Sequence, residues 1–428
     1  MNSDELVVLL EGEVAGTLTR RRSGLQLSYD ERFADHGDAT PLSVSMPTQV
    51  AEHGDAVVTP WLWGLLPDNH LVIERWARQF QASASSPFAL LATQVGEDCA
   101  GAVQLARPDR VEALRRAPGS VTWLDEEAVA DRIRALRENP TSWLGPDFTG
   151  QWSLGGAQAK LALRHEEGRW GVPSGASATT HILKPAIAGL DDHDLNEHLC
   201  LSAAGRAGLI VARSALATFE DQAVVVVERY DRVASGTAGD DVVRVHQEDL
   251  CQALSVHPGR KYQSEGGPSA ARIARLLRDV MPPAKATTDV WRFFDALAWN
   301  WLIAGTDAHA KNYSLLLSGT SARLAPLYDV GSALPYGEHL PKLKMAMALG
   351  GEYRLVGHHR QTWPRVAIDL GLDAELAVAR IRELALRAPD AFRDVGSAPD
   401  ITGTGRQLAS RLLDEVAART TSCLAMLR

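Results

Sequence analysis

The stretch from Asp289 to Ala304 is apolar on nearly every side when it is drawn as a helix. A helix at the surface of a protein would show one polar face, so this pattern predicts a helix that is buried inside a domain. Such burial requires other elements all around the helix. A chain of 428 residues, of which 45% are hydrophobic and 23% charged, is long enough to supply them and has a globular composition.

Patterns on either side of this helix predict a sheet-rich part followed by a mainly helical part. Residues 5–29 alternate between apolar and polar, which is typical of a small antiparallel sheet. Residues 140–150 are rich in Pro, Gly and Thr and indicate a boundary. Strands are expected at Lys160–Leu163, His181–Lys184 and Ala223–Val227, with helices at Leu124–Asn139 and around Leu195–Ala203, and mainly helices from about residue 247 onward.

Charge and cysteine content limit the possible partners and the compartment. The net charge of −9 and the pI near 5.8 disfavour nucleic acid as a primary ligand, and a basic protein partner is more natural. The four cysteines are widely separated and form no CxxC pair, which favours buried thiols in a reducing compartment. Because the sequence shows neither a signal-peptide pattern nor a long apolar run, we expect a cytoplasmic protein without a membrane segment.

The residues after the buried helix, Gly305–Asn312, carry the strongest chemical signal and lead into an apolar strand, Tyr313–Leu317. Asp307 and Asn312 are five residues apart on one loop. They can place a carboxylate at an acceptor hydroxyl and an amide at a magnesium ion, as the catalytic loops of kinases do. Lys311 can neutralise a phosphoryl group during its transfer.

A second acidic position supports the same chemistry. Asp329 follows Asn312 by seventeen residues, at the end of another short apolar segment, with Gly331 two residues further on. A magnesium-binding aspartate of a kinase lies at such a place. Either feature alone, the pair Asp307 and Asn312 or the segment with Asp329 and Gly331, is more often structural. In such cases the Asp caps a turn and the Asn supports a loop. The two together, in this order, favour a kinase.

Three upstream segments could bind a nucleotide. Ser153–Lys160 is a turn of small residues whose backbone N–H groups could cradle phosphates, although a plain hairpin turn is the alternative. Lys184, at the end of a strand, can reach nucleotide phosphates, and Glu197 on the next helix could hold it by an ion pair. Glu228–Arg232 could form the hinge that pairs with adenine, and a buried strand that leaves the core explains these residues equally well.

Taken together, these segments resemble the HipA family, the kinase toxins of type II toxin–antitoxin modules, along almost the whole chain. Gly64–Asp68 and Gly101–Gln104 are similar to the N-terminal domain of that family. The segments that are similar to its kinase domain are Ser153–Lys160, Thr180–Lys184, Asn196-Glu197, Val227–Arg232, Gln247–Asp249, Lys261-Tyr262, Gly266–Pro268, Thr306–Asn312 and Tyr328-Asp329.

The resemblance implies an α+β fold of the bilobal protein-kinase type, with a mixed, β-rich N-terminal part and a mainly α-helical C-terminal lobe. It also implies three segments along the chain. These are a HipA-type N-terminal domain at 1–148, a kinase N-lobe core with the ATP loop and hinge at 149–230, and a helical C-lobe with the catalytic loop at 231–428.

Residue roles follow from the resemblance position by position. Asp307 would be the catalytic base, assisted by Lys311. Asn312 and Asp329 would bind the metal, Ser153 would be autophosphorylated, and Glu197 would form the supporting ion pair. The residues implied to bind ATP are Gly155, Gly156, Ala157, Gln158, Ala159, Lys160, Lys184, Glu228, Arg229, Tyr230, His309, Ala310, Lys311, Asn312, Tyr328 and Asp329.

The resemblance further implies ATP and Mg²⁺ as cofactors and two kinds of partner. One is a HipB-like helix-turn-helix antitoxin that binds operator DNA, so DNA would be contacted only through the antitoxin. The other is a protein substrate, for example an aminoacyl-tRNA synthetase. Two alternatives stay open: a small-molecule kinase on a kinase-like scaffold, which would not need the N-terminal region, and a nucleotide-binding corepressor without kinase activity, for which the intact catalytic set would be unnecessary.

Overall fold

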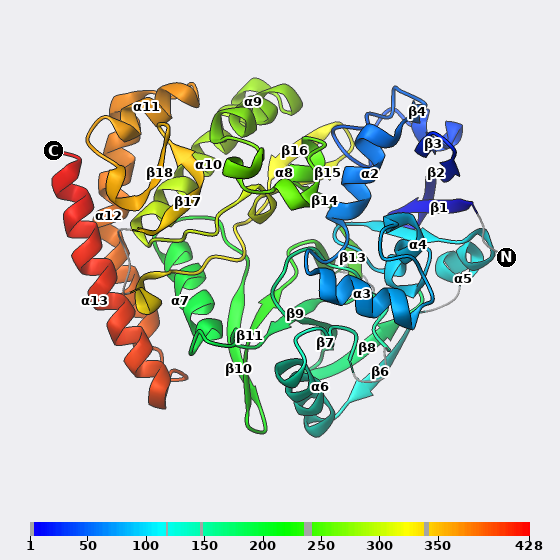
Figure 1. Ribbon diagram of the computed structural model, residues 1–428, viewed down its shortest axis with the longest axis horizontal. Helices are drawn as coiled ribbons and strands as arrows, with labels where there is room; N and C mark the ends of the chain where they lie inside the picture. Colours follow the sequence, from blue (N-terminus) through cyan, green and yellow to red (C-terminus); the bar gives the residue numbers. More distant parts are fainter. Residues whose placement is uncertain (1–3, 117–118, 146–148, 235–241, 338–341) are drawn as a thin grey trace. The chain divides into compact units, whose positions relative to one another are not determined.

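The computed structural model describes residues 4–116, 119–145, 149–234, 242–337 and 342–428 (Figure 1). The chain forms two compact units, each built from several segments. The first unit contains 1–185, 218–259 and 314–322, and the second contains 186–217, 260–313 and 323–428. Because each unit combines separate segments, the expected division at residues 148 and 230 stays a prediction.

A five-stranded sheet opens the first unit, in the order β4-β3-β2-β1-β5. β1 pairs antiparallel with both β2 and β5, which confirms the sheet predicted for residues 5–29. Leu6 and Val8 point into the core and are fully buried. The strands are β1 (Glu5–Leu10), β2 (Glu13–Arg21), β3 (Gly24–Tyr29), β4 (Glu52–His53) and β5 (Val103–Ala106).

A six-stranded sheet of order β10-β11-β9-β7-β8-β6 carries the predicted nucleotide segments. The pairs from β11 to β6 are antiparallel, and the predicted strands at 160–163, 181–184 and 223–227 are all present with small shifts in their ends. Helix α6 (Glu126–Glu138) packs against β6 and β11. The strands are β6 (Ser120–Leu124), β7 (Leu161–Glu166), β8 (Arg169–Ser174), β9 (His181–Lys184), β10 (Ser214–Phe219) and β11 (Gln222–Glu228).

Shorter elements complete the first unit. β14 pairs with β15, the strand that follows the predicted catalytic loop in sequence. The remaining strands are β12 (Arg232–Ala234), β13 (Val242–Arg244), β14 (His246–Asp249), β15 (Ser314–Ser318) and β16 (Ser321–Leu324). The helices are α1 (Glu31–Ala34), α2 (Asp55–Gly64), α3 (His70–Gln79), α4 (Pro87–Leu91), α5 (Val111–Arg116) and α8 (Leu250–Ala253).

Helix α10 (Pro283–Leu302) forms the centre of the second unit. It packs against α9, α12 and α13, and Trp299 stacks on Phe392 of α12 with ring centroids 5.9 Å apart. The prediction of a buried helix is therefore confirmed. The other elements are α7 (His193–Arg206), α9 (Ala270–Val280), α11 (Thr362–Asp369), α12 (Ala374–Gly396), α13 (Gly403–Met426), β17 (Lys344–Leu349) and β18 (Glu352–Arg354).

All four cysteines are buried thiols, and none forms a disulfide within the described parts of the chain. Likewise, no helix in the portion of the chain that the structure describes is long and apolar enough to cross a membrane.

Candidate functional site

The loop that carries Asp307 begins where α10 ends. Ala304 adopts a left-handed conformation with φ of 52°, which terminates the helix, and the Gly305 N–H donates to the Asn300 carbonyl at 2.7 Å. A Cβ atom on Gly305 would lie only 2.3 Å from the Asn300 Oδ1. Glycine is therefore needed at this turn, which sets where the loop leaves the helix.

Within this loop, the backbone of Asp307 is held while its carboxylate is accessible. The Asp307 carbonyl accepts hydrogen bonds from the His309 N–H and from Asn312 Nδ2, both at 2.8 Å. His309, Lys311 and Asn312 are buried, whereas Asp307 is exposed. Because Asn312 donates through Nδ2, its Oδ1 is the atom that can coordinate a cation.

Asp329 is brought to the same loop by its neighbour Tyr328. The Tyr328 hydroxyl donates to the Lys311 carbonyl at 2.7 Å. On the other side, the Leu327 N–H donates to the Ile210 carbonyl at 2.9 Å. Asp329 itself has a φ of 56°, a left-handed conformation that is uncommon for a residue other than glycine and that is often found at functional sites. The predicted base and both predicted metal ligands therefore belong to one connected part of the second unit.

The oxygen groups of Asn312 and Asp329 are of the type that could hold a magnesium ion together with nucleotide phosphates. Among the described residues, no group of three or more His, Cys, Asp or Glu side chains forms a cage for a metal ion. Mg²⁺ commonly uses one or two protein oxygen ligands and takes the others from phosphates and water. One carboxylate and one amide on a kinase-like loop match this requirement.

In the first unit, the strand register shows which side chains share a face with Lys184. Ile182 lies two residues before Lys184 and therefore on the same face of the sheet. It is paired across the sheet with Ala162 on one side and with Val227 on the other. Ile182 is partly exposed, whereas Ala162 and Val227 are buried. Lys184 thus stands beside an apolar floor, a residue set that the sequence reasoning missed although the alternation of β9 could have indicated it.

Glu228 lies on the opposite face of this sheet. It is the cross-strand partner of His181, whose position is out of phase with that of Lys184. Only the backbone of Glu228, and not its side chain, is therefore suited to a ligand on the Lys184 face. Further along the predicted hinge, the Tyr230 hydroxyl donates a hydrogen bond to Gln247 Oε1.

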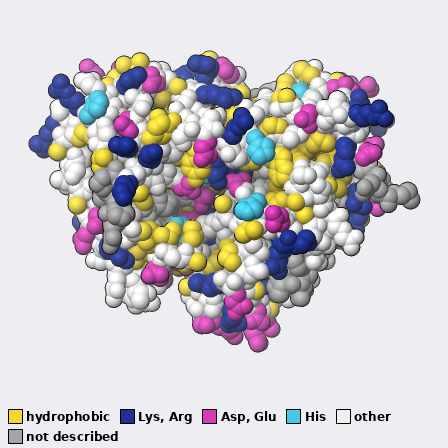
Figure 2. Space-filling model, viewed as in Figure 1, with side chains coloured by type: hydrophobic (Ala, Val, Ile, Leu, Met, Phe, Trp, Pro, Cys, Tyr) yellow, Lys and Arg dark blue, Asp and Glu magenta, His cyan; other side chains and the backbone are white. Residues whose placement is uncertain are grey.

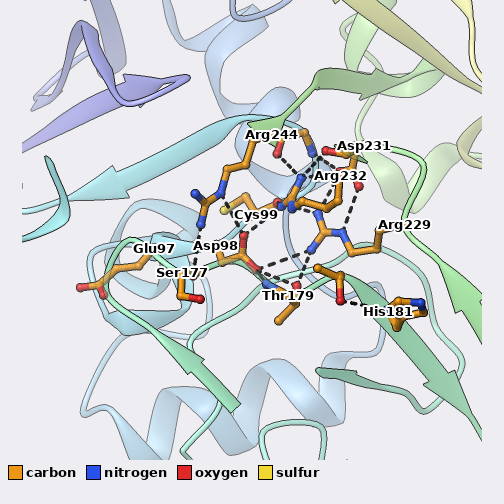
Figure 3. Close-up of polar contacts among 12 residues, drawn as sticks. Glu97, Asp98, Cys99, Ser177, Thr179, His181, Arg229, Asp231, Arg232 and Arg244 are labelled. Carbon is orange, nitrogen blue, oxygen red and sulfur yellow. Dashed lines mark hydrogen bonds and ion pairs between the residues drawn. The ribbon is translucent and has the colours of Figure 1, made fainter. Parts of the chain in front are cut away.

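Arg229 is held inside a buried ionic network, so its polar groups are occupied. Figure 3 shows the Arg229 side chain directed toward Asp231 and Thr179. Arg229 donates to Asp231 at 2.9 Å and to Thr179 Oγ1 at 2.7 Å. Its N–H donates to the Thr180 carbonyl at 2.9 Å, and its carbonyl accepts from Arg232 at 3.1 Å. Arg229 was predicted to bind ATP, and this role stays a prediction, although its side chain is engaged in the buried network.

The same network joins the hinge to the loop before β5. Arg232 Nη2 donates to Asp98 at 2.9 Å, and Arg244 lies 3.3 Å from the same oxygen. Burial alone would raise the pKa of Asp98, but the charges of Arg232, Arg244 and Arg229 outweigh it and keep this pKa well below its usual range. Burial also lowers the pKa of Arg232 to about 10. Because removing one member would leave buried charges uncompensated, the conformation of the predicted hinge segment 228–232 depends on this network.

The loop Ser153–Lys160 is ordered by contacts of its own. Ser153 is fully buried, and its hydroxyl donates to the Leu65 carbonyl at 2.7 Å. Lys160 bends back and donates to the Gly155 carbonyl at 2.7 Å. Gly156 has a φ of 100°, and a Cβ atom there would lie 2.7 Å from Lys160 Nζ. Glycine is thus required at position 156, as expected for a tight loop.

The few lysines of this chain are concentrated at predicted nucleotide-binding positions. The chain contains only seven lysines among 44 basic residues, and Lys160, Lys184 and Lys311 are each 6% exposed. Buried lysines are rare and are usually paired. A chain that uses arginine almost everywhere else has therefore kept its buried lysines at three of the predicted nucleotide positions.

The structure places the predicted residues in two sets. Ser153, the loop 155–160, Lys184 and the hinge 228–230 belong to the first unit, whereas Glu197, the loop 307–312 and Asp329 belong to the second. Lys184 and Glu197 are thus in different units, and their ion pair stays a prediction. Glu197 is 2% exposed on α7.

Asn196, next to Glu197, was part of the resemblance but had no predicted role. Its side chain binds the backbone of Ser332, three residues after Asp329, through two hydrogen bonds of 2.7 and 3.1 Å. On the same helix, His193 lies against the segment that follows Asp329, because a Cβ atom on Gly331 would lie 3.6 Å from His193 Nε2. α7 is thus tied directly to the segment that carries Asp329.

Comparison with known proteins gives the family. Residues 152–392 match the HipA-like C-terminal domain, and residues 6–106 match the HipA N-terminal domain. The chain belongs to the HipA-like kinase family. The matched C-terminal domain covers more than half of the chain and includes the loop 153–160, the hinge, Asp307 and Asp329.

Two relatives extend this similarity over most of the chain. Y4mE of Sinorhizobium fredii, which is named provisionally as a kinase, is 36% identical over 387 residues, or 89% of each chain. The serine/threonine-protein kinase toxin HipA of Shewanella oneidensis is 26% identical over 396 residues, or 86% of each chain.

A solved structure confirms the fold class. The structure resembles a chain in the complex of HipA, HipB and operator DNA from Shewanella oneidensis MR-1, with a TM-score of 0.85 and 23% identity. The similarity covers 99% of this chain and 98% of that one. The predicted α+β, kinase-like fold is therefore correct.

Proposed function

We propose that this HipA-like protein is an ATP- and magnesium-dependent serine/threonine protein kinase that acts as a toxin. The observation that supports this most is the connected arrangement of the loop 307–312 with Asp329. It combines an exposed carboxylate, an amide held against the Asp307 carbonyl, and a strained acidic residue tied to the loop by Tyr328. A base and two metal ligands in this order are what phosphoryl transfer requires.

Each residue of the loop would act on a different part of the reaction. Asp307 accepts a hydrogen bond from the acceptor hydroxyl, orients it, and takes its proton as the new P–O bond to the γ-phosphorus forms. The bond between the γ-phosphorus and the β–γ bridging oxygen of ATP breaks in the same step, and ADP leaves with that oxygen. Lys311 offsets the negative charge of the transferring phosphoryl group. Asn312 Oδ1 and the Asp329 carboxylate would hold Mg²⁺, which when bound neutralises and orients the phosphates of ATP.

Residues of the first unit would bind the nucleotide. Lys184 and the backbone of the loop 155–160 bind its phosphates, the apolar floor around Ile182 contacts adenine, and backbone groups at Glu228 and Tyr230 pair with its edge. We further propose that Ser153 is autophosphorylated, which would place a charged group at the start of the phosphate-binding loop.

The matched Shewanella structure is a complex of HipA, HipB and operator DNA, which supports a HipB-like antitoxin as a partner of this chain. We propose that operator DNA is contacted only through that antitoxin. A net charge of −9 favours a basic protein acceptor. Figure 2 shows acidic and basic side chains interspersed over the visible face, so we expect docking to use local charge pairs. An aminoacyl-tRNA synthetase is one candidate acceptor, and the cytoplasm is the expected location.

The test is incubation of the purified protein with γ-labelled ATP, Mg²⁺ and a cell lysate, alongside the Asp307→Asn variant. This near-isosteric change removes the proton-accepting charge, and we expect transfer to fall by a factor on the order of 10² to 10⁴. Labelled protein bands that disappear with the variant would support the proposal. Label in small molecules would favour a small-molecule kinase, and absence of label would favour a corepressor.

A further inference from the structure

The segment Arg260–Gly267 is folded against the proposed catalytic loop. The Lys261 carbonyl accepts a hydrogen bond from the Ala310 N–H at 3.4 Å, and the Gly267 N–H closes a turn onto the Tyr262 carbonyl at 2.9 Å. A Cβ atom on Gly267 would lie 2.4 to 2.8 Å from three backbone carbonyls of this turn. Glycine is therefore required at 267, and the turn that it closes sets the position of Tyr262.

Tyr262 contacts two residues of the catalytic loop. Its hydroxyl donates a hydrogen bond to Asp307 Oδ1. Its ring meets the His309 ring edge to face, with centroids 5.0 Å apart and an interplanar angle of 84°. Because His309 is buried, it provides a fixed wall for the tyrosine ring.

These two contacts together restrict the Asp307 side chain. A carboxylate can rotate about its Cα–Cβ and Cβ–Cγ bonds, and an exposed aspartate would sample several orientations. A donor that holds Oδ1 selects one of them and leaves Oδ2 available for another donor. In a kinase that second donor is the acceptor hydroxyl. Holding the base in one orientation increases the fraction of encounters in which the acceptor is correctly placed.

We propose that Tyr262 is a positioning residue that orients the Asp307 carboxylate for the acceptor hydroxyl. The proposal rests on the proposed kinase function, because it assigns Tyr262 a role only through Asp307. The bond joins a partly exposed tyrosine to an exposed aspartate, so it adds little to the stability of the unit, and its main effect is on the geometry of the base.

The experiment measures turnover of MgATP and transfer of label by the full chain for wild type, Tyr262→Phe, Asp307→Asn and the double variant. Tyr262→Phe keeps the ring against His309 and removes only the hydroxyl. We expect kcat to fall roughly tenfold with an unchanged KM for ATP, because one charge-assisted hydrogen bond is lost and the nucleotide contacts are intact. In the Asp307→Asn background the same change should cause no further loss.

The matched control is Tyr353→Phe, which removes a tyrosine hydroxyl from β18 in the same unit and should leave kcat unchanged. Equal losses from Tyr262→Phe in both backgrounds would overturn the proposal, since they would indicate a general structural defect. A variant with wild-type kcat would overturn it as well. If the wild type transfers no phosphate at all, the kinase function fails first, and the role of Tyr262 fails with it.

Discussion

Asn196 holds the backbone of Ser332 from both sides, although the two residues are 136 positions apart in sequence. Its Nδ2 donates to the Ser332 carbonyl at 2.7 Å, and its Oδ1 accepts from the Ser332 N–H at 3.1 Å. The Ser332 hydroxyl in turn donates to the carbonyl of Ile303, at the end of α10, at 2.6 Å. One buried serine therefore links α7, the end of α10 and the segment that carries Asp329.

This clamp predicts a defect in metal use when Asn196 is changed to Asp. The carboxylate still accepts from the Ser332 N–H but faces the Ser332 carbonyl without a donor, which should cost about 1 to 3 kcal/mol of the free energy of unfolding. Because Asp329 lies three residues from Ser332, we also expect half-saturation to require several-fold more Mg²⁺. Urea unfolding and Mg²⁺ titration of ATP binding measure the two effects.

Gln252→Glu provides a control for the clamp prediction. The Gln252 side chain is also buried and also bridges two backbone groups, the Asp249 N–H at 3.0 Å and the Trp61 carbonyl at 2.9 Å, but it lies in the first unit. The Gln252→Glu variant should lose about as much free energy of unfolding as Asn196→Asp and keep the wild-type Mg²⁺ requirement. If both variants change the Mg²⁺ requirement equally, the contact of Asn196 with Ser332 has no specific link to the proposed metal ligand Asp329.

The parts of the fold that the sequence predicted are those governed by local pattern. α10 and the strand His181–Lys184 follow from periodicity, that is, from the spacing of apolar residues along a short stretch of sequence. Contacts between distant residues have no such signal. Asn196 with Ser332, or Asp98 with Arg232 across 134 positions, arise only once the elements have packed.

In the candidate site, too, some residues could be predicted from the sequence, whereas others depend on how distant elements pack. Asp307, Asn312 and Asp329 were predicted because their types and order suggest chemistry. The occupied side chain of Arg229 and the floor around Ile182 were not predicted, since the first depends on a buried network and the second on strand register. Tyr262 was noted only as part of a motif, because the bond to Asp307 joins two separate loops.

The two proposed metal ligands, Asp329 and Asn312, should contribute differently to Mg²⁺-dependent nucleotide binding. Asp329→Ala removes a full negative charge and Asn312→Ala removes a neutral oxygen, so the first should weaken Mg²⁺-dependent nucleotide binding more. We expect losses of about ten- to a hundredfold and about three- to tenfold, respectively. Binding of ATP with and without Mg²⁺, followed by calorimetry, gives the comparison. Nucleotide affinity in Asp329→Ala that depends on Mg²⁺ as strongly as in the parent would contradict the assignment of Asp329.

His246 predicts a loss of stability in mild acid. Burial lowers the pKa of this histidine to about 4, from an ordinary value near 6.5, although Nε2 donates to the Leu42 carbonyl at 3.1 Å. Between these pH values His246 binds a proton in the unfolded chain but not in the folded protein. The contribution of His246 to the free energy of unfolding is therefore fully present above about pH 6.5 and decreases as the pH falls toward 4.

At pH 5 the protonation of His246 in the unfolded chain lowers the free energy of unfolding by about 2 kcal/mol. His246→Gln, which can still donate to Leu42, should therefore show a smaller decrease in unfolding free energy between pH 7.5 and pH 5 than the wild type. His36→Gln serves as the control because His36 is exposed, and its pH dependence should equal that of the wild type. Identical slopes for the wild type and His246→Gln would remove His246 as a cause.

Ser153 provides the last prediction, because its buried position determines what autophosphorylation must do. The hydroxyl donates to the Leu65 carbonyl and the N–H donates to the Asp98 carbonyl at 2.9 Å, so the residue is held between two acceptors. A kinase cannot reach this hydroxyl until the segment opens. Once modified, a phosphate of about −1.5 to −2 charges cannot return to a buried site that faces carbonyl oxygens.

We therefore expect that MgATP slowly converts the active protein into a form with phosphate on Ser153, an open loop near residue 153 and weakened ATP binding. Ser153→Ala should lose about 1 kcal/mol of stability, keep transfer activity and escape this self-inactivation. Mass spectrometry gives the modification, and limited proteolysis gives the opening. Phosphate on Ser153 in the Asp307→Asn variant expressed in the same cells would indicate another kinase. Unmodified Ser153 in active protein after prolonged incubation with MgATP would rule out self-inactivation by autophosphorylation, because the phosphate proposed to open the loop would be missing.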